Sequence, residues 1–333
     1  MSDLTAVSVA LVGTFFLGLI IAPLVIKGAA KLKAGQTILS YVEQHNVKQG
    51  TPTFGGLIFL TSTVVVATIF GCWQYSVSRM ALLVFLGYGI IGFLDDFIKI
   101  KFHENKGLKA YQKIIFQLIV AVFVAYFAYK NVYVGSTIAL NFGLEGVDIG
   151  VWYIPFAVVT FIAMSNAVNL TDGLDGLAAT TSTIYTITLT IINLFMLYDA
   201  VTYGKSTYIG ELRSLAVTSS ALIGGMLAFL WFNNHKASVF MGDTGSLALG
   251  AFAAAQALFI KNPLIGVLVG IMFVISCISV IIQVVSFKLR GRRVLLMAPF
   301  HHHLELKGIN ESKIVGYYAI VTIIAGVTAL AII

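Results

Sequence analysis

Residues 166–177 read Asn-Ala-Val-Asn-Leu-Thr-Asp-Gly-Leu-Asp-Gly-Leu, and they join two long apolar runs at about 152–170 and 176–198. Each run is long enough to cross a bilayer as a helix. The joining segment contains no cation and places Asn166, Asn169, Asp172 and Asp175 at this boundary. Carboxylates at a membrane boundary are costly and are kept where they bind something. The stretch therefore predicts two membrane helices joined by a ligand-binding loop.

The whole chain has the composition of a membrane protein. Of its 333 residues, 59% are hydrophobic and 11% are charged, whereas soluble domains are about a quarter charged. No linker or internal repeat divides the chain, so we expect a single integral domain over residues 1–333. The first apolar run lacks the basic start and the cleavage pattern of a signal peptide, so it is expected to remain as a span. Cys72 and Cys277 lie in or beside apolar runs and are predicted to be reduced packing residues.

Runs of spanning length predict an all-α integral membrane protein with about ten transmembrane helices. They lie near 4–26, 54–72, 80–94, 111–130, 152–170, 176–198, 211–232, 245–260, 263–287 and 314–333. With ten spans, the odd-numbered loops share one side and carry sixteen of the 21 basic residues. The positive-inside rule makes that side cytoplasmic and both termini external. On the outer side, residues 131–151 alternate short apolar stretches with glycines, which predicts a small β-hairpin.

The net charge of +7 is interpreted as a consequence of this topology. Nucleic-acid binding would require an aqueous basic face, and the sequence offers no such domain. Membrane lipids and anionic substrates are the expected partners instead.

Unusual polar clusters fall in the five loops predicted to be cytoplasmic. The first loop ends in Lys-Gln-Gly-Thr-Pro-Thr-Phe-Gly-Gly, in which Lys48 precedes a helix start, where anions tend to bind. In the next cluster, Asp95 and Asp96 end an apolar run and are followed by several lysines. Adjacent helical residues point about 100° apart. We therefore expect one of the two to hold a metal or substrate while the other pairs with a lysine or caps a neighbouring helix.

The third and fourth clusters add amides and further carboxylates. Asp172 and Asp175 are three residues apart and share a face if the helix has begun there, although turn and cap chemistry also explains them. Asn233, Phe240 and Asp243 lie in the segment 231–246, where glycines allow the backbone to approach a phosphate or a metal closely. A simple helix cap by Asp243 is the alternative.

The last cluster contains three consecutive histidines, His301, His302 and His303. They cannot all face one way on a helix, so a loop with divergent side chains is expected. A structural zinc site would need further ligands at the right spacing. Donors to phosphate or sugar oxygens are the preferred interpretation.

Five acidic residues gathered at one boundary repel one another unless a cation enters. Mg²⁺ suits them because it prefers hard oxygen ligands and shares its shell with substrate phosphates. Phosphoryl transfer to a membrane lipid is therefore the favoured reaction class.

The motifs at 92–99, 166–177, 233–246 and 299–307 resemble those of the polyprenyl-phosphate N-acetylhexosamine-1-phosphate transferases. Within them, the chain is most similar to the bacterial phospho-N-acetylmuramoyl-pentapeptide transferases (translocase I). The likeness covers nearly the whole chain. The triple histidine distinguishes this branch from the relatives that use N-acetylglucosamine.

The resemblance implies a Mg²⁺-dependent enzyme of the bacterial inner membrane whose active site faces the cytoplasm. It implies transfer of phospho-N-acetylmuramoyl-pentapeptide from UDP-MurNAc-pentapeptide to undecaprenyl phosphate, giving lipid I and UMP in peptidoglycan synthesis. It also implies a homodimer and inhibition by nucleoside-type compounds.

The resemblance also implies a role for each residue that matches a family motif. Catalytic roles are implied for the aspartates, asparagine and histidines of the motifs, with Asp243 also the magnesium ligand: Asp95, Asp96, Asn233, Asp243, His301, His302 and His303. Substrate binding is predicted for three lysines and for residues near the uridine and diphosphate: Lys48, Lys106, Lys113, Asn169, Asp172, Asp175 and Phe240.

Two questions stay open at this stage. Direct attack by the lipid phosphate is favoured over a covalent enzyme intermediate, because a phosphate monoester with a second pKa near 6 is largely dianionic at neutral pH. A sister enzyme using UDP-GlcNAc is the nearer alternative function. A secondary transporter or flippase is disfavoured, because such proteins place polar groups near the midplane of repeated halves.

Overall fold

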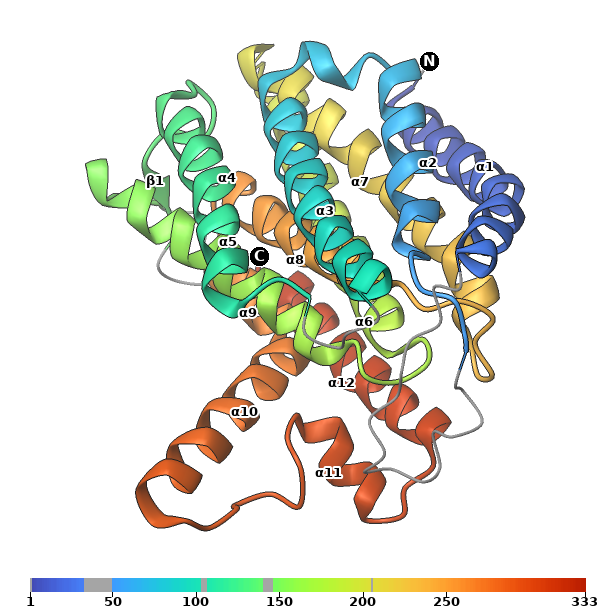
Figure 1. Ribbon diagram of the computed structural model, residues 1–333. Helices are drawn as coiled ribbons and strands as arrows, with labels where there is room; N and C mark the ends of the chain where they lie inside the picture. Colours follow the sequence, from blue (N-terminus) through green and yellow to red (C-terminus); the bar gives the residue numbers. More distant parts are fainter. Residues whose placement is uncertain (1, 33–49, 103–106, 140–145, 205) are drawn as a thin grey trace.

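Most of the described chain folds into helices, as the apolar runs predict. The computed structural model describes residues 2–32, 50–102, 107–139, 146–204 and 206–333 (Figure 1). The helices in chain order are α1 (Asp3–Lys31), α2 (Gly56–Ile69), α3 (Ser76–Phe102), α4 (Ala110–Lys130), α5 (Tyr153–Thr171), α6 (Leu177–Thr202), α7 (Ser206–Asn233), α8 (Gly242–Phe259), α9 (Pro263–Val269), α10 (Ile271–Arg290), α11 (Phe300–Leu306) and α12 (Glu311–Ile332).

Eight helices in the described residues are long and apolar enough to cross a membrane: α1, α3, α4, α5 with its preceding turn, α6, α7, α10 and α12. The all-α membrane class is therefore confirmed, whereas the count of ten spans is not. Helix α2 has only 14 residues. Helix α8 exists where a span is expected, but it is rich in small and polar residues and is not among these eight.

Helix α8 is the centre of the bundle. Every residue from Thr244 to Phe259 is buried, and the helix packs against α2, α3, α5 and α6 (Figure 1). Small residues allow this close packing. A side chain at Gly56 on α2 would collide with the backbone of Gly245 on α8. A helix enclosed on all sides by protein does not need a strongly apolar surface, which explains its low hydropathy.

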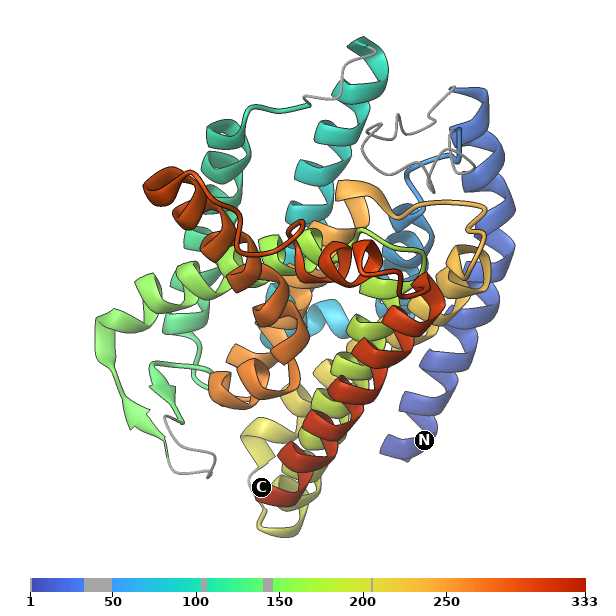
Figure 2. The ribbon, with the colours of Figure 1, turned by 90° about the horizontal axis from the view of Figure 1, so that it is seen from below.

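The ninth predicted span, 263–287, is broken in the structure. Asn262 caps the start of α9, and Gly270 both ends α9 and precedes α10. Glycine disfavours the helix interior, so a change of direction is least costly there. Helix α10 then runs obliquely away from the bundle (Figures 1 and 2), and its buried residues, Met272, Phe273, Ser276 and Ser279, all lie in its first half.

The predicted hairpin is present but very small. Strand β1 (Thr137–Ile138) pairs antiparallel with β2 (Val147–Asp148), at one edge of the molecule in Figure 2. The Ala139 amide donates to the Lys261 carbonyl at 2.8 Å, which ties the hairpin to the turn after α8.

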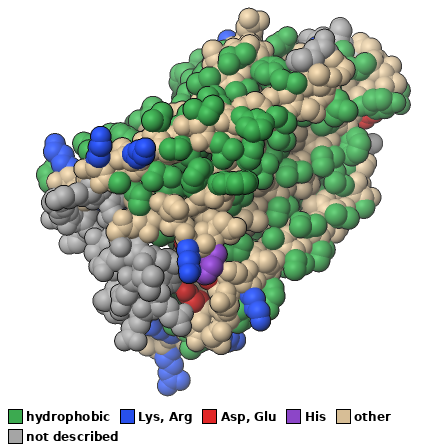
Figure 3. Space-filling view, turned by 90° about the vertical axis from the view of Figure 1, so that its right-hand side faces the viewer, with side chains coloured by type: hydrophobic (Ala, Val, Ile, Leu, Met, Phe, Trp, Pro, Cys, Tyr) green, Lys and Arg blue, Asp and Glu red, His purple; other side chains and the backbone are tan. Residues whose placement is uncertain are grey.

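The surface also fits a membrane protein. Helix α4 alone exposes Ile114, Ile119, Val122, Phe123 and Phe127. In Figure 3, hydrophobic side chains cover much of the face shown, while most lysines and arginines visible there gather toward its left and lower edges. An apolar surface of this extent is buried by lipid or by another protein.

Candidate active site

The end of α3 packs closely against the first turn of α8. A side chain at Gly92 would collide with the carbonyl group of Asp243 and the amide of Thr244, so glycine permits this approach. One turn later, Asp96 accepts hydrogen bonds from the Asp243 amide (3.2 Å), the Thr244 amide (2.9 Å) and the Thr244 hydroxyl (2.7 Å). Asp96 therefore caps α8 from a neighbouring helix, and it replaces the missing side-chain cap at Met241.

Asp95 has a different environment from Asp96. Its Oδ2 lies 2.6 Å from Lys99 Nζ, and its Oδ1 lies 3.3 Å from Lys113 Nζ on α4. The Leu108 amide also donates to Oδ1 at 2.9 Å. Asp95 is thus paired with lysines and Asp96 caps a neighbouring helix, so both contacts expected for only one of the two aspartates are present, one on each. The role of holding a metal or substrate stays a prediction.

The same two lysines hold Asp243. Its Oδ2 accepts from Lys113 at 2.7 Å and from Lys99 at 3.1 Å. Because Lys99 Nζ is also 3.8 Å from Asp96, three carboxylates surround two ammonium groups. We call Asp95, Asp96, Asp243, Lys99 and Lys113 the lysine-bridged cluster. It carries one net negative charge when all five groups are ionised.

Asn169 fixes the remaining oxygen of Asp243. Its Nδ2 donates to Asp243 Oδ1 at 2.7 Å and to Ser246 Oγ at 2.8 Å. Asn169 lies near the end of α5, so α3, α4, α5 and α8 all contribute to the position of one carboxylate. Burying such charges is costly unless every partner is in place.

Asp172 lies in the loop after α5 and is only partly buried. Among the described residues, its carboxylate makes no hydrogen bond or ion pair. Burial raises the pKa of Asp172 well above its usual range, and the negative charges of Asp243, Asp96 and Asp175 raise it further. This carboxyl group therefore lies within electrostatic reach of the lysine-bridged cluster.

Asp175 belongs to a second group of polar residues. Its Oδ2 accepts from the Ala237 amide at 3.1 Å, and its own amide donates to Glu311 on α12 at 2.6 Å. Ligand atoms of Asp175, His235 and Glu311 lie within 4.8 Å of one another. We call these three residues the second cluster. It joins the α5–α6 loop, the α7–α8 loop and the start of α12.

Asn233 connects two of these loops through its side chain. Its Oδ1 accepts from the Gly176 amide at 3.0 Å, and its Nδ2 donates to the Val239 carbonyl at 2.8 Å. Both ends of the amide are thus used by the backbone. The structure gives Asn233 a supporting position, and its catalytic role stays a prediction.

The three histidines lie on the short helix α11, so the expected loop is wrong, whereas the expected divergence of their side chains is confirmed. His302 Nδ1 lies 3.0 Å from Glu305, and His303 Nδ1 accepts from the Leu296 amide at 3.1 Å. His301 is fully buried, and neither of its ring nitrogens has a partner. Burial lowers the pKa of His301 to about 3.

Helix α11 begins directly after Pro299, whose fixed backbone suits a helix start. The ring of His301 rests on Gly173, where a side chain would collide with it. The histidine helix and the central loop 172–176 are therefore in direct contact.

Phe240 is partly buried in the α7–α8 loop. Its amide donates to the Pro52 carbonyl at 2.9 Å, and its carbonyl accepts from the Gly55 amide at 2.8 Å. The segment before α2 thus meets the loop before α8. Lys48 and Lys106, both predicted to bind substrate, lie outside the described residues.

Comparison with known proteins identifies the family. A model described as glycosyl transferase family 4 matches residues 78–261, which include most of the lysine-bridged cluster's supporting helices. The chain belongs to this family. It is 44% identical to the phospho-N-acetylmuramoyl-pentapeptide-transferase of Clostridium novyi (strain NT), over 93% of this chain and 91% of that protein.

Two further relatives carry the same name and are similar to this chain to the same degree. The Thermoanaerobacter sp. (strain X514) protein is 45% identical over 97% of both chains, and the Clostridium perfringens (strain 13 / Type A) protein is 45% identical over 95% of both. The resemblance inferred from the motifs is therefore confirmed across nearly the full length.

The residues of this glycosyl transferase family 4 chain suit a divalent cation. Carboxylate oxygens of Asp95, Asp96 and Asp243 lie within 4.8 Å of one another. The ammonium of Lys99 lies between them, at 2.6 Å from Asp95, 3.1 Å from Asp243 and 3.8 Å from Asp96. A cation is thus already accommodated among these hard oxygen atoms, which are the ligands that Mg²⁺ prefers.

Three members of these groups were not predicted as site residues: Lys99, His235 and Glu311. Lys99 follows Asp95 by four residues and Asp96 by three, and that helical spacing is a signal that could have identified it. Glu311 follows Asn310, the cap of α12. Acidic residues are common in the first turn of a helix, so its sequence position does not indicate a functional role. No sequence signal relates it to Asp175, 136 residues earlier.

Proposed function

We propose that this chain transfers phospho-N-acetylmuramoyl-pentapeptide from UDP-MurNAc-pentapeptide to undecaprenyl phosphate, giving lipid I and UMP. The observation that carries the proposal is the lysine-bridged cluster, because it combines carboxylates for a metal with ammonium groups for phosphates. Family membership and the printed names of relatives at about 45% identity support the same reaction.

We further propose that this site opens to the cytoplasm and that the chain crosses the membrane ten times, with α9 and α10 as one broken crossing. The ends of α3 and α5 and the starts of α4 and α8 meet at Asp243. This convergence supports the prediction that the odd-numbered loops lie on the same side of the membrane. The excess of basic residues in those loops supports the cytoplasmic side.

Asp243, with Asp95 and Asp96 beside it, is proposed to hold Mg²⁺. When bound, the ion would neutralise charge developing on the leaving phosphate. Lys99 and Lys113 partly balance the charge of the neighbouring carboxylates and offer positive charge to the phosphates of both substrates. Asn169 and Ser246 keep Asp243 in one orientation, so the cluster is organised before substrate arrives.

We propose direct attack by an oxygen of the lipid phosphate on the phosphorus attached to the sugar. The new P–O bond forms as the bond to the bridging oxygen breaks, and UMP leaves with that electron pair. Asp95 is paired with two lysines, which lowers its nucleophilicity and favours orientation over covalent catalysis. A single-turnover quench that trapped a phosphosugar on an aspartate would contradict this order of events.

Recognition of the sugar nucleotide is proposed for the loops around the cluster. Asp175, Asp172 and Phe240 would face the uridine and diphosphate, and His301 lies against the same loop through Gly173. A buried ring with two unpartnered nitrogens gains hydrogen bonds when a polar ligand reaches it. The triple histidine also favours the muramoyl substrate over UDP-GlcNAc, the alternative.

The test is incubation of the purified protein with radiolabelled UDP-MurNAc-pentapeptide, undecaprenyl phosphate and Mg²⁺. Labelled lipid I is expected, with UMP released in equal amount. A parallel reaction with UDP-GlcNAc should give no lipid product. A GlcNAc lipid would favour the sister activity, and the absence of any product in either reaction would contradict the transferase assignment.

A further inference from the structure

A separate cavity lies at the opposite end of α3 and α4 from the lysine-bridged cluster. The two helices pack side by side and run in opposite directions (Figure 1). Arg79 precedes Asp95 by sixteen residues, which is about 24 Å along a helix. The distance approaches the thickness of a bilayer core, about 30 Å. A ligand in this cavity would therefore sit in the other leaflet from the active site.

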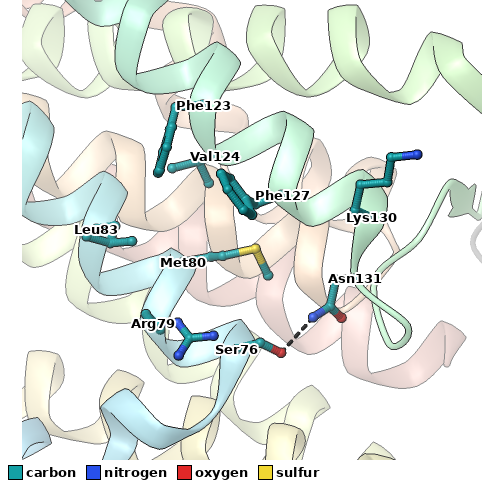
Figure 4. A pocket seen from close by; sticks show the side chains of 9 residues that line it. All are labelled: Ser76, Arg79, Met80, Leu83, Phe123, Val124, Phe127, Lys130 and Asn131. Atoms are coloured by element: carbon teal, nitrogen blue, oxygen red, sulfur yellow. Dashed lines mark hydrogen bonds between the residues drawn. The ribbon is translucent and has the colours of Figure 1, made fainter.

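The cavity has a volume of about 420 Å³, within the size range of ligand pockets. Figure 4 shows the rings of Phe123 and Phe127 on one side, Met80 between, and Arg79 with Ser76 on the other. Phe123 and Phe127 are 53% and 50% exposed, so the apolar wall continues onto the lipid-facing surface of α4. The cavity is thus polar at one end and open to lipid at the other.

Arg79 has no ion pair or side-chain hydrogen bond among the described residues. The carboxylate at the start of α3 has other partners, because Glu211 accepts from the Ser76 amide (3.2 Å), the Ser76 hydroxyl (2.6 Å) and the Val77 amide (2.8 Å). Glu211 therefore caps α3, and within the described part of the chain Arg79 is a cation without an anionic partner.

A second cation stands at the rim of the same cavity. Lys130, the last residue of α4, lines it with its stem, and its ammonium extends outward in Figure 4, 5.3 Å from the Tyr129 ring. Two other basic residues in this half of the molecule have different partners. Arg213 pairs with Asp3 at 2.5 Å, and Lys261 lies 5.0 Å from the Tyr133 ring.

We propose that this cavity binds an anionic phospholipid, with the headgroup phosphate on Arg79 and Lys130 and an acyl chain along Phe123 and Phe127. A guanidinium and an ammonium next to an apolar wall match the two chemical parts of such a lipid. A zwitterionic phospholipid would bring its own cation and leave the pair of positive charges unbalanced. The anionic headgroup is therefore preferred.

The experiment measures the thermal unfolding midpoint of the delipidated full-length protein in neutral detergent while lipid is added. Phosphatidylglycerol should raise the midpoint of the parent protein by several degrees at saturation, and phosphatidylcholine should not. The double variant Arg79→Ala/Lys130→Ala should lose at least half of that shift. The matched control Arg213→Gln removes a cation in the same half but outside the cavity, and it should keep the full shift.

Undecaprenyl phosphate is the third lipid to be tested in the same experiment, because it also carries a phosphate on an apolar chain. Its effect comes from the active site and should be the same in the parent and the double variant. The proposal is overturned if phosphatidylcholine matches phosphatidylglycerol, if the double variant keeps the whole shift, or if only undecaprenyl phosphate responds to the substitutions.

Single substitutions guard against a folding defect in the double variant. Arg79→Lys keeps the charge and should retain most of the phosphatidylglycerol shift, whereas Arg79→Gln and Lys130→Gln should each lose part of it. All variants should synthesise lipid I normally in phosphatidylcholine, since neither residue lies near the active site. Full retention of the shift in both glutamine variants would contradict the proposal.

Discussion

The lysine-bridged cluster and helix α11 differ in whether their buried polar side chains have hydrogen-bond partners. In the cluster, both oxygens of Asp243 and of Asp96 have partners, drawn from several helices. In α11, His301 is buried with neither ring nitrogen bonded. An unsatisfied buried polar group costs about 1–3 kcal/mol. The cluster is thus organised in advance, whereas α11 retains unmet hydrogen-bonding capacity.

The difference separates two tasks within one site. Electrostatic stabilisation requires charges that do not reorient during the reaction, and this is the role proposed for the cluster. Recognition benefits from groups that gain hydrogen bonds only when a ligand arrives, and this is the role proposed for His301. Substitutions in the cluster should therefore reduce turnover, and substitutions in α11 should change substrate affinity and pH dependence more than the rate of the chemical step.

The largest effect is expected from Asp243→Asn. The substitution removes one of three negative charges and leaves two carboxylates balanced by two lysines, so a divalent cation loses its attraction to the site. We expect kcat to fall by about 10²–10³-fold, the range seen when one electrostatic group is removed at a reacting centre. The measurement is lipid I formation across a Mg²⁺ titration.

Asp199→Asn is the control for that substitution, because Asp199 is an exposed carboxylate near the far end of α6. It should leave kcat and the Mg²⁺ requirement unchanged. Full Mg²⁺-dependent turnover by Asp243→Asn would remove the cluster from the chemistry.

A smaller effect is expected from His301→Phe on the pH dependence of stability. Burial lowers the pKa of His301 from 6.5 to about 3. Between those values the unfolded chain binds a proton that the folded chain does not, so stability falls as the pH falls through this window. The slope is at most about 1.4 kcal/mol per pH unit. Phenylalanine keeps a ring against Gly173 and cannot titrate.

His301→Phe should therefore show a flatter loss of stability between about pH 6 and pH 4 in thermal unfolding, with a raised KM for the sugar nucleotide. An unchanged slope in His301→Phe would show that His301 is hydrated or partnered in solution.

Much of this site was predictable because polar residues are conspicuous in an apolar sequence. Asp95, Asp96 and Asp243 were selected on that basis, and the structure places all three together. The division of labour between Asp95 and Asp96 was not predictable. It depends on the contact of Gly92 with the backbone of Asp243, about 150 residues later in the sequence, and no local pattern records that approach.

Prediction of the fold from the sequence has the same limit, because contacts between distant segments are not recorded locally. Hydropathy located the helices well, because each must bury or present an apolar surface. It did not reveal that α8 is enclosed on all sides, nor that the run 263–287 changes direction at Gly270. Both features are set by the packing of neighbouring helices, which the composition of a single segment does not contain.

The smallest effect is expected from Asp96→Asn, and it tests the contrast within the acidic pair. An asparagine oxygen can still accept from the Thr244 amide and hydroxyl, as asparagine does at ordinary helix caps. Its NH₂ group would face the Asp243 amide, so the 3.2 Å hydrogen bond is lost. We expect a loss of about 1 kcal/mol in unfolding free energy. Turnover should fall much less than in Asp95→Asn, which removes the carboxylate shared by both lysines. If Asp96→Asn instead abolished turnover while Asp95→Asn preserved it, the helix cap would be the reacting group and the roles assigned from these contacts would be reversed.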